Sequence, residues 1–67
     1  ETIRINGEAR PYEHRTVRDL LSAEGIGLTS RGIAIALNGA VVPKADWDGT
    51  SLKPGDAVEI VRAMQGG

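Results

Sequence analysis

Polar and apolar residues alternate near the start of the chain, over Thr2–Ile5, and this is the period of a half-buried β-strand. Asn6 and Gly7 follow directly. Because both residue types tolerate a positive φ, the pair predicts a tight hairpin turn between two strands.

The returning strand is expected over residues 8–12, and its register with the first strand decides which side chains share a face. A two-residue loop would pair Ile3 with Arg10 and place charge on the apolar face. The pattern therefore favours a three-residue loop with Gly7 in a bulge. Pro11 lacks an N–H group, which limits this strand to a bulge or a weakly paired position.

A short helix is predicted after Thr16, whose hydroxyl is suited to cap the first turn, with Asp19 three positions later as in a capping box. An apolar stripe at i, i+3 and i+4 is formed by Val17, Leu20 and Leu21. Gly25 and Gly27 are expected to end the helix after Glu24. Two turns are not stable alone in water, so this helix must pack on a sheet.

A continuous apolar run, Ile33–Leu37, has the length of a central strand that is covered on at least one face. Asn38 and Gly39 predict a second tight turn. Ala40–Val42 then returns as a strand, and Pro43 ends it. Residues 44–51 are expected to be irregular.

The last strand is expected over Ala57–Arg62, after a type II turn with Pro54 and Gly55 at its centre. Alternation turns Val58 and Ile60 toward the helix. The order of elements predicts an α+β fold, a roll of the β-grasp type with one main helix packed on a mixed sheet of about five strands. Residues 1–62 form the single domain in this interpretation, and residues 63–67 form a flexible C-terminal tail.

Composition narrows the possible functions. A chain of 67 residues holds one small core, which five Val, six Ile and five Leu must fill, so a deep active-site cavity is not expected. The lack of Cys excludes disulfides and thiolate metal sites, and a net charge of −1 with interspersed signs argues against nucleic acid or an anionic membrane as a partner. With no secretory segment evident, we expect a cytoplasmic protein. Glu1 in place of Met indicates that the native start was removed or is not included.

The chain ends in Gly66 and Gly67, which follow Met64 and Gln65. Without Cβ atoms, such a tail is slim enough to enter a narrow tunnel in another enzyme. The carboxylate of Gly67 is then open to activation by ATP as an acyl-adenylate. Because no nucleophile–base pair or metal cluster is evident, the pattern favours a carrier without catalytic or metal-binding residues.

Much of the chain resembles a known family. The residues that carry the similarity are Asn6, Thr16-Val17, Leu20-Leu21, the segments 33–38 and 38–47, Leu52, Gly55-Asp56, Glu59-Ile60 and Gly66-Gly67. They resemble the sulfur carrier proteins of thiamine biosynthesis, the ThiS family, whose members are ubiquitin-like in fold.

The resemblance implies a function and a set of partners. An adenylyltransferase, or activating enzyme, would use ATP to adenylate the carboxylate of Gly67, while the carrier itself would bind no cofactor. Sulfur from a cysteine desulfurase or a rhodanese-like donor would convert that carboxylate to a thiocarboxylate, which thiazole synthase would use to build the thiazole ring. Met64, Gln65 and Gly66 would thread the active sites of these partners. The chain would be a co-substrate and not an enzyme.

Three alternatives remain open on the sequence. The small subunit of molybdopterin synthase shares the roll and the Gly-Gly end, but it is usually longer and has aromatic residues before its terminus, whereas this chain has no Phe. A TGS-like regulatory binding module matches the segments around Asn38 and Gly55 but needs no free Gly-Gly end. A ubiquitin-like modifier would be joined to Lys side chains of other proteins.

Other notable residues have plainer interpretations. Trp47 is expected to fill the core under a long loop and not to form a binding hot spot. His14 is expected to be solvated, and turn chemistry explains Asp46 and Asp48 better than a Mg²⁺ site does. Four arginines are expected to lie together on one solvent-exposed face; they are Arg4, Arg10, Arg15 and Arg18.

Contacts on the globular domain must contribute to docking, because a flexible tail loses conformational entropy when it is bound. Alternation places Ala57, Glu59 and Val61 on the sheet face opposite the helix. Val61 is the apolar residue of this set nearest the tail, so Val61 and Arg62 are candidates for a partner-docking site. In the alternative, Trp47 or its loop covers Val61.

Overall fold

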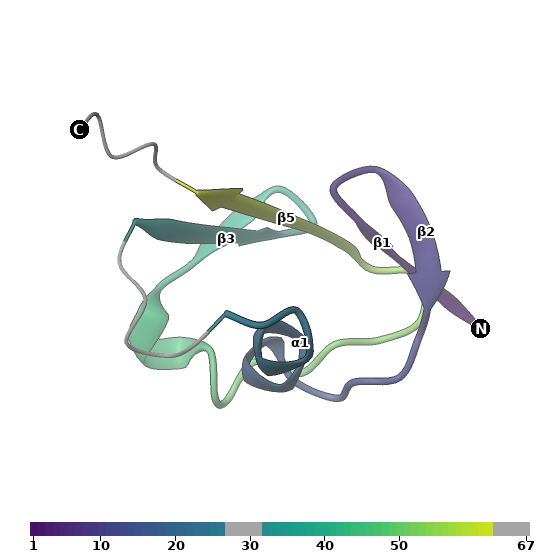
Figure 1. The fold of residues 1–67 in the computed structure, drawn as a ribbon, viewed down its shortest axis with the longest axis horizontal. Helices are drawn as coiled ribbons and strands as arrows, with labels where there is room; N and C mark the ends of the chain where they lie inside the picture. Colours follow the sequence, from purple (N-terminus) through teal and green to yellow (C-terminus); the bar gives the residue numbers. More distant parts are fainter. Residues whose placement is uncertain (27–31, 63–67) are drawn as a thin grey trace.

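A computed structural model describes residues 1–26 and 32–62 of the chain. Within them, one mixed sheet is formed by β1 (Thr2–Ile5), β2 (Glu8–Pro11), β3 (Ile33–Leu37), β4 (Ala40–Val42) and β5 (Ala57–Arg62). The sheet order is β2-β1-β5-β3-β4, in which β1 and β5 run parallel and the other neighbours antiparallel. The helix α1 (Val17–Ala23) packs against one face of this sheet (Figure 1). The expected fold, one helix on a mixed five-stranded sheet, is confirmed.

The helix begins where its local sequence predicts, and it ends at Ala23, one residue before the expected end, with Glu24 as its C-cap. The Oγ1 atom of Thr16 accepts a hydrogen bond from the N–H of Asp19 at 3.1 Å, which satisfies one of the free donors of the first turn. At the other end, Gly25 has a φ of 80°, which Gly adopts without steric cost. Gly27 lies outside the described residues. The apolar stripe is buried in the core, as the spacing of Val17, Leu20 and Leu21 predicts.

The loop before β5 is joined to the start of α1 by two backbone hydrogen bonds. The carbonyl oxygen of Thr50 accepts a hydrogen bond from the N–H of Val17 at 3.0 Å. The carbonyl oxygen of Trp47 accepts one from the N–H of Arg18 at 3.1 Å. Trp47 fills the core as expected, with its side chain buried and its Nε1 donating to the carbonyl of Val42 at 2.9 Å. Loop and helix therefore form one layer over the sheet.

The register of the first hairpin differs from the expectation. Asn6 and Gly7, with φ values of 52° and 81°, form a two-residue turn, and Ile3 consequently pairs with Arg10. The expected three-residue loop with a bulge is wrong. The sheet accommodates the charge because β2 is an edge strand, from which the guanidinium of Arg10 reaches the carboxylate of Glu24 at the end of α1, at 3.0 Å.

Smaller differences concern the limits of elements. β2 ends at Pro11, one residue before the expected end, and it lies at the sheet edge, where a residue without an N–H is tolerated. Residues 44–51, expected to be irregular, include the 3₁₀ helix η1 (Lys44–Asp46). The strand Ile33–Leu37 has neighbours on both sides, although the middle position of the sheet belongs to β5.

The division into a domain and a tail stays a prediction, because residues 63–67 lie outside the described residues. Across residues 1–26 and 32–62, no helix has the length and apolar character needed to cross a bilayer.

Candidate functional site

The middle strand of the sheet, β5, leads toward the predicted reactive end of the chain. It lies between β1 and β3, and its pairing with β3 continues as far as Arg62, which lies opposite Ile33. The predicted tail, residues 63–67, lies outside the described residues, so the roles of its four candidate site residues stay predictions; these are Met64, Gln65, Gly66 and Gly67. The structure therefore defines the end of β5, which precedes these residues in the chain, and the surfaces around that strand end.

An open hollow of about 400 Å³ lies beside the end of β5, on the side of the sheet that carries α1. Its lining includes Ile60 and Arg62 of β5, Asn6 of the first turn, and the ion pair between Arg10 and Glu24. Because the arginine of this pair is 41% exposed, the pair contributes at most about 1 kcal/mol to stability. The hollow is an open, largely polar recess next to Arg62, the last residue of β5.

The sheet face opposite α1 carries a group of apolar side chains, which we call the outer patch and which consists of Ala34, Ala36, Val41 and Val61. The exposed Glu59 lies on the same face, opposite Ala36. Ala34 lies opposite Val61, and Ala36 lies opposite Val41, so these side chains are neighbours across β5, β3 and β4. Val41 is 76% exposed and Val61 is 58% exposed. No helix in the described part of the chain covers this face (Figure 1).

Val61 is not covered by Trp47. The indole of Trp47 belongs to the core between sheet and helix, together with Ile35 and Val58, whereas strand alternation turns Val61 the other way. The alternative in which Trp47 or its loop covers Val61 is wrong. Arg62, the second docking candidate, is also exposed, but it lies on the helix side beside the hollow.

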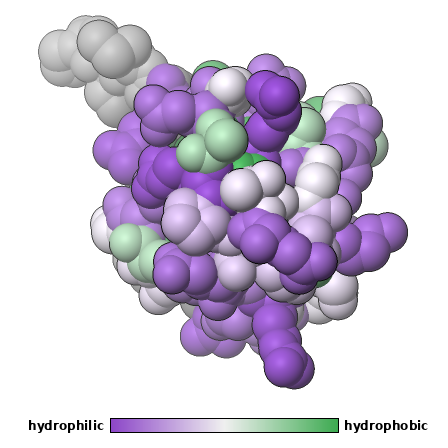
Figure 2. All heavy atoms as spheres, turned by 90° about the vertical axis from the view of Figure 1, so that its right-hand side faces the viewer, coloured by the Kyte–Doolittle hydropathy of each residue, from purple (hydrophilic) through white to green (hydrophobic). Residues whose placement is uncertain are grey.

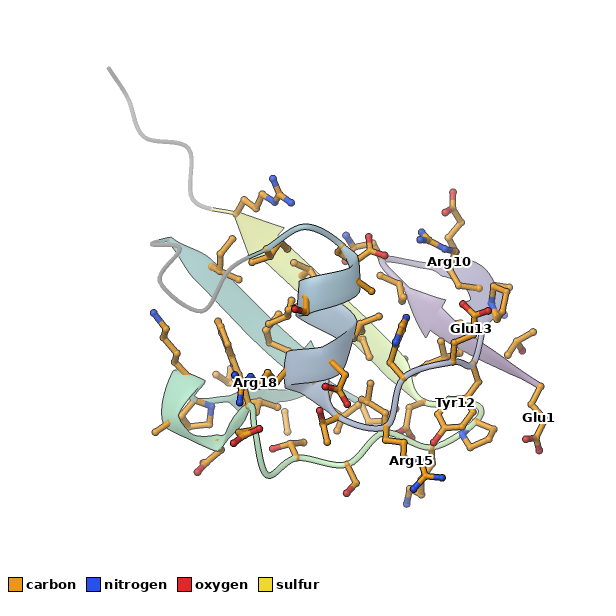
Figure 3. The ribbon with its side chains drawn as sticks, turned by 60° about the horizontal axis from the view of Figure 1, so that its bottom comes forward. Glu1, Arg10, Tyr12, Glu13, Arg15 and Arg18 are labelled. Atoms are coloured by element: carbon orange, nitrogen blue, oxygen red, sulfur yellow. The ribbon has the colours of Figure 1, made fainter. Side chains whose placement is uncertain are left out.

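The four arginines do not share one face. Arg4 lies on β1 opposite Ala57, on the outer side of the sheet. Arg10 reaches from β2 to the end of α1, while Arg18 lies on the helix itself, 3.3 Å from a carboxylate oxygen of Asp48 (Figure 3). Arg15 lies in the connection between β2 and α1. The expected single solvated face is wrong, because these residues belong to different parts of the fold.

The remaining candidates show no site chemistry. His14 is half-buried and not fully solvated. Within the described residues, no group of three or more His, Cys, Asp or Glu side chains could hold a metal ion, and every buried side-chain nitrogen or oxygen has a hydrogen-bond partner. The surface at the hairpin end of the molecule is mostly hydrophilic (Figure 2).

The sequence predicts Asn6 and Asn38 as turn residues, but it does not predict that their side chains form hydrogen bonds to the backbone of β5. The Oδ1 of Asn38 accepts a hydrogen bond from the N–H of Ala57 at 2.9 Å. The amide group of Asn6 bonds to the backbone of Ile60. These partners are 19 and 54 positions away in the chain, so no local pattern indicates them.

Comparison with known proteins gives a consistent result. Residues 3–67 match the ThiS family. The chain is 38% identical over 63 residues to the sulfur carrier protein ThiS of Thermus thermophilus, and the aligned region covers 94% of this chain and 95% of that protein. It is 35% identical over 63 residues to a thiazole synthase of Paramagnetospirillum magneticum, of which it covers 19%.

The fold leads to the same assignment. The crystal structure of the thiamine biosynthesis protein ThiS from Geobacter metallireducens has a TM-score of 0.81 and 31% identity to this chain, with 100% of both chains covered. A solution NMR structure of a thiamine biosynthesis protein from the same organism has a TM-score of 0.79 and covers 100% of this chain and 88% of the other. Sequence and fold agree over nearly the whole length, and the chain belongs to the ThiS family.

Proposed function

We propose that this chain is a sulfur carrier in thiamine biosynthesis, acting as a protein co-substrate whose chemistry takes place at Gly67. The observation that carries the proposal is the family match over residues 3–67, which includes Gly66 and Gly67, with 38% identity to a protein named as a sulfur carrier. The proposal requires a free α-carboxylate on Gly67.

The chemistry follows from that carboxylate. Its oxygen attacks the α-phosphate of ATP in the activating enzyme, so that pyrophosphate leaves and an acyl-adenylate forms. The outer sulfur of a persulfide on the sulfur donor then displaces AMP at the carbonyl carbon and forms an acyl disulfide. A second thiol cleaves the S–S bond, which releases the thiocarboxylate and leaves a disulfide between the two thiols. The carrier binds no cofactor of its own, because ATP is bound by the partner. Gly66, Gln65 and Met64 lie in the partner's tunnel during these steps.

The partners are an activating enzyme, a sulfur donor and thiazole synthase. The thiazole synthase of Paramagnetospirillum magneticum supports the last of these, because a segment of it is similar to 94% of this chain. A cysteine desulfurase or a rhodanese-like protein supplies the sulfur. The reaction takes place in the cytoplasm, where ATP is available.

The outer patch is the surface on which a partner docks. It is apolar, it is exposed, and it reaches Val61, which lies in the strand that leads to the tail. A tail that is ordered on binding costs about 1–2 kcal/mol for each residue, so contacts of the folded domain must offset that loss. Arg62, which is exposed on the other side of β5, contributes a second contact to the partner in this proposal.

The test is to incubate the protein with ATP, the cognate activating enzyme and a sulfur source, and to measure its intact mass. Replacement of one oxygen by sulfur raises the mass by about 16 Da, and the same spectrum shows whether Gly67 is the terminal residue. An unchanged mass under conditions in which the enzyme consumes ATP with another carrier would contradict the proposal. Conjugates of high mass would indicate a ubiquitin-like modifier instead.

Two variants localise the chemistry. Deletion of Gly67 should leave folding intact, since a terminal residue buries little, and should abolish the increase in mass. The second variant, Gly66→Val, adds a β-branched side chain that widens and stiffens the tail. It should change the free energy of unfolding by less than about 0.5 kcal/mol, while the rate of adenylation should fall close to zero. Normal adenylation of Gly66→Val would show that the partner does not enclose the tail.

A further inference from the structure

The side chain of Asn6 takes the place of a strand residue next to β5. The backbone ladder between β1 and β5 consists of Arg4–Ala57 and Ile5–Val58, and it stops there because the chain turns at Asn6 with a φ of 52°. The N–H of Asn6 still donates to the carbonyl of Val58 at 2.9 Å. The backbone thus leaves the sheet at this residue while β5 continues past the hairpin (Figure 1).

The next pair of hydrogen bonds on this side of β5 is made by the side-chain amide of Asn6, and we call this pair the Asn6 rung. Its Oδ1 accepts a hydrogen bond from the N–H of Ile60 at 2.8 Å, and its Nδ2 donates to the carbonyl of the same residue at 3.3 Å. In a strand, the backbone groups that face one neighbour come from alternate residues, here Val58 and Ile60. One side chain therefore satisfies both backbone groups of Ile60 on the β1 side.

The position of this rung relates it to the tail. Ile60 lies two residues before Arg62, the last residue of β5, and on the β1 side no described strand pairs with β5 after Val58. Within the described residues, the Asn6 rung is therefore the last hydrogen-bonded constraint on β5 from the β1 side. Without it, the backbone hydrogen bonds that the described residues make to the end of β5 would come from β3 alone, beside the packing of the Ile60 side chain against the core.

We propose that Asn6 is a positioning residue for the carrier reaction: by holding Ile60 it fixes the direction in which the tail leaves the domain. The proposal rests on the proposed function, because it concerns delivery of Gly67 to an activating enzyme. A fixed strand end reduces the conformational freedom that docking must remove. The effect should therefore fall on KM for the carrier, while kcat stays unchanged once the tail is in place.

The molecule offers a matched control in Asn38. It occupies the same place in the other Asn-Gly turn, with a φ of 51°, and its side chain also bonds to β5, but at Ala57, at the start of the strand. Asn6→Gly and Asn38→Gly keep a residue that tolerates positive φ, and each removes two side-chain hydrogen bonds. They differ in which end of β5 they release.

The experiment measures steady-state adenylation of the carrier well below the melting temperature of each variant. Asn6→Gly should raise KM about tenfold with kcat unchanged, an apparent loss of about 1.4 kcal/mol. Asn38→Gly should change KM less than about twofold, even where its melting temperature falls as far. Asn6→Asp keeps the acceptor for the N–H of Ile60 and should recover part of the KM. Amide hydrogen exchange at Ile60 should speed up in Asn6→Gly and not in Asn38→Gly.

Equal KM values for the two glycine variants, or KM changes that follow melting temperature in both, would overturn the positioning role and leave a structural one. Unchanged exchange at Ile60 in Asn6→Gly would overturn it as well. If the unaltered protein is not adenylated at all, the proposed function fails. The exchange measurement, which needs no partner, would still report whether Asn6 holds the end of β5.

Discussion

Asp56 is the buried charged side chain of the described part of the chain, with 7% of its surface exposed. Its Oδ2 accepts a hydrogen bond from the N–H of Lys53 at 2.8 Å, and its Oδ1 accepts one from Nδ2 of Asn38 at 3.0 Å. Burial of a carboxylate is costly unless such bonds replace those lost to water. Asp56 thereby joins the turn before β5 to the turn between β3 and β4.

Replacing Asp56 with Ala removes both acceptors and takes one partner from the amide of Asn38. We expect the free energy of unfolding, measured by urea denaturation, to fall by about 2–3 kcal/mol. Asp48→Ala is the control: its side chain is 75% exposed and pairs with Arg18, so the expected loss is below about 0.5 kcal/mol. Equal losses in the two variants would contradict the role assigned to Asp56.

Among the elements, α1 depends most on its surroundings. It has seven residues, too few for a stable helix in water, so packing and capping must hold it. Its first N–H groups donate to the carbonyl oxygens of Thr50 and Trp47 and to the hydroxyl of Thr16. Two of these three acceptors belong to the loop before β5, which explains why helix and loop form one layer.

Thr16→Ala removes the hydroxyl that caps the helix and should lower the free energy of unfolding by about 1 kcal/mol. For a domain of this size, that loss corresponds to a fall in melting temperature of about 4–8 °C, measured by circular dichroism. Thr16→Ser keeps the oxygen acceptor and should retain most of the stability. If Ser were as destabilising as Ala, the lost methyl group and not the cap would be responsible.

In the whole molecule, the two faces of the sheet have different environments. The inner face is covered by α1 and Trp47, which enclose Ile35 and Val58. The outer face carries the outer patch, whose valines stay exposed. An apolar side chain that contacts no core is free to change without loss of the fold, so its substitution separates docking from stability.

Val61→Glu should shift the melting temperature little, because Val61 is 58% exposed. A charge in an apolar interface should weaken binding to the activating enzyme at least tenfold, or about 1.4 kcal/mol, as measured by calorimetry. Thr2→Glu makes the same charge change at an exposed position on β1, away from the patch, and should leave affinity unchanged. Unchanged affinity in Val61→Glu would remove the outer patch as a docking surface.

Several features of the fold were predictable because residues a few positions apart decide them. The turns at Asn6 and Asn38 follow from the tolerance of Asn-Gly for positive φ, and the helix start follows from the hydroxyl of Thr16. Strand alternation correctly separated Val58 from Val61, since side chains in a strand point to opposite faces in turn. The family resemblance indicates a sulfur carrier without reference to any contact, and the family match confirms the family.

Other features depend on groups that lie far apart in the chain. The strand pattern indicates that the pairing of Ile3 with Arg10 is unfavourable, because it places a charged side chain on the apolar face. The pairing is tolerated because the guanidinium of Arg10 forms an ion pair with Glu24 at the end of the helix. The side-chain amide of Asn6 bonds to Ile60 because the strand order of the sheet places β1 beside β5. A hydrogen bond acts over about 3 Å in space whatever the separation in sequence, so such contacts arise from packing and leave no local pattern.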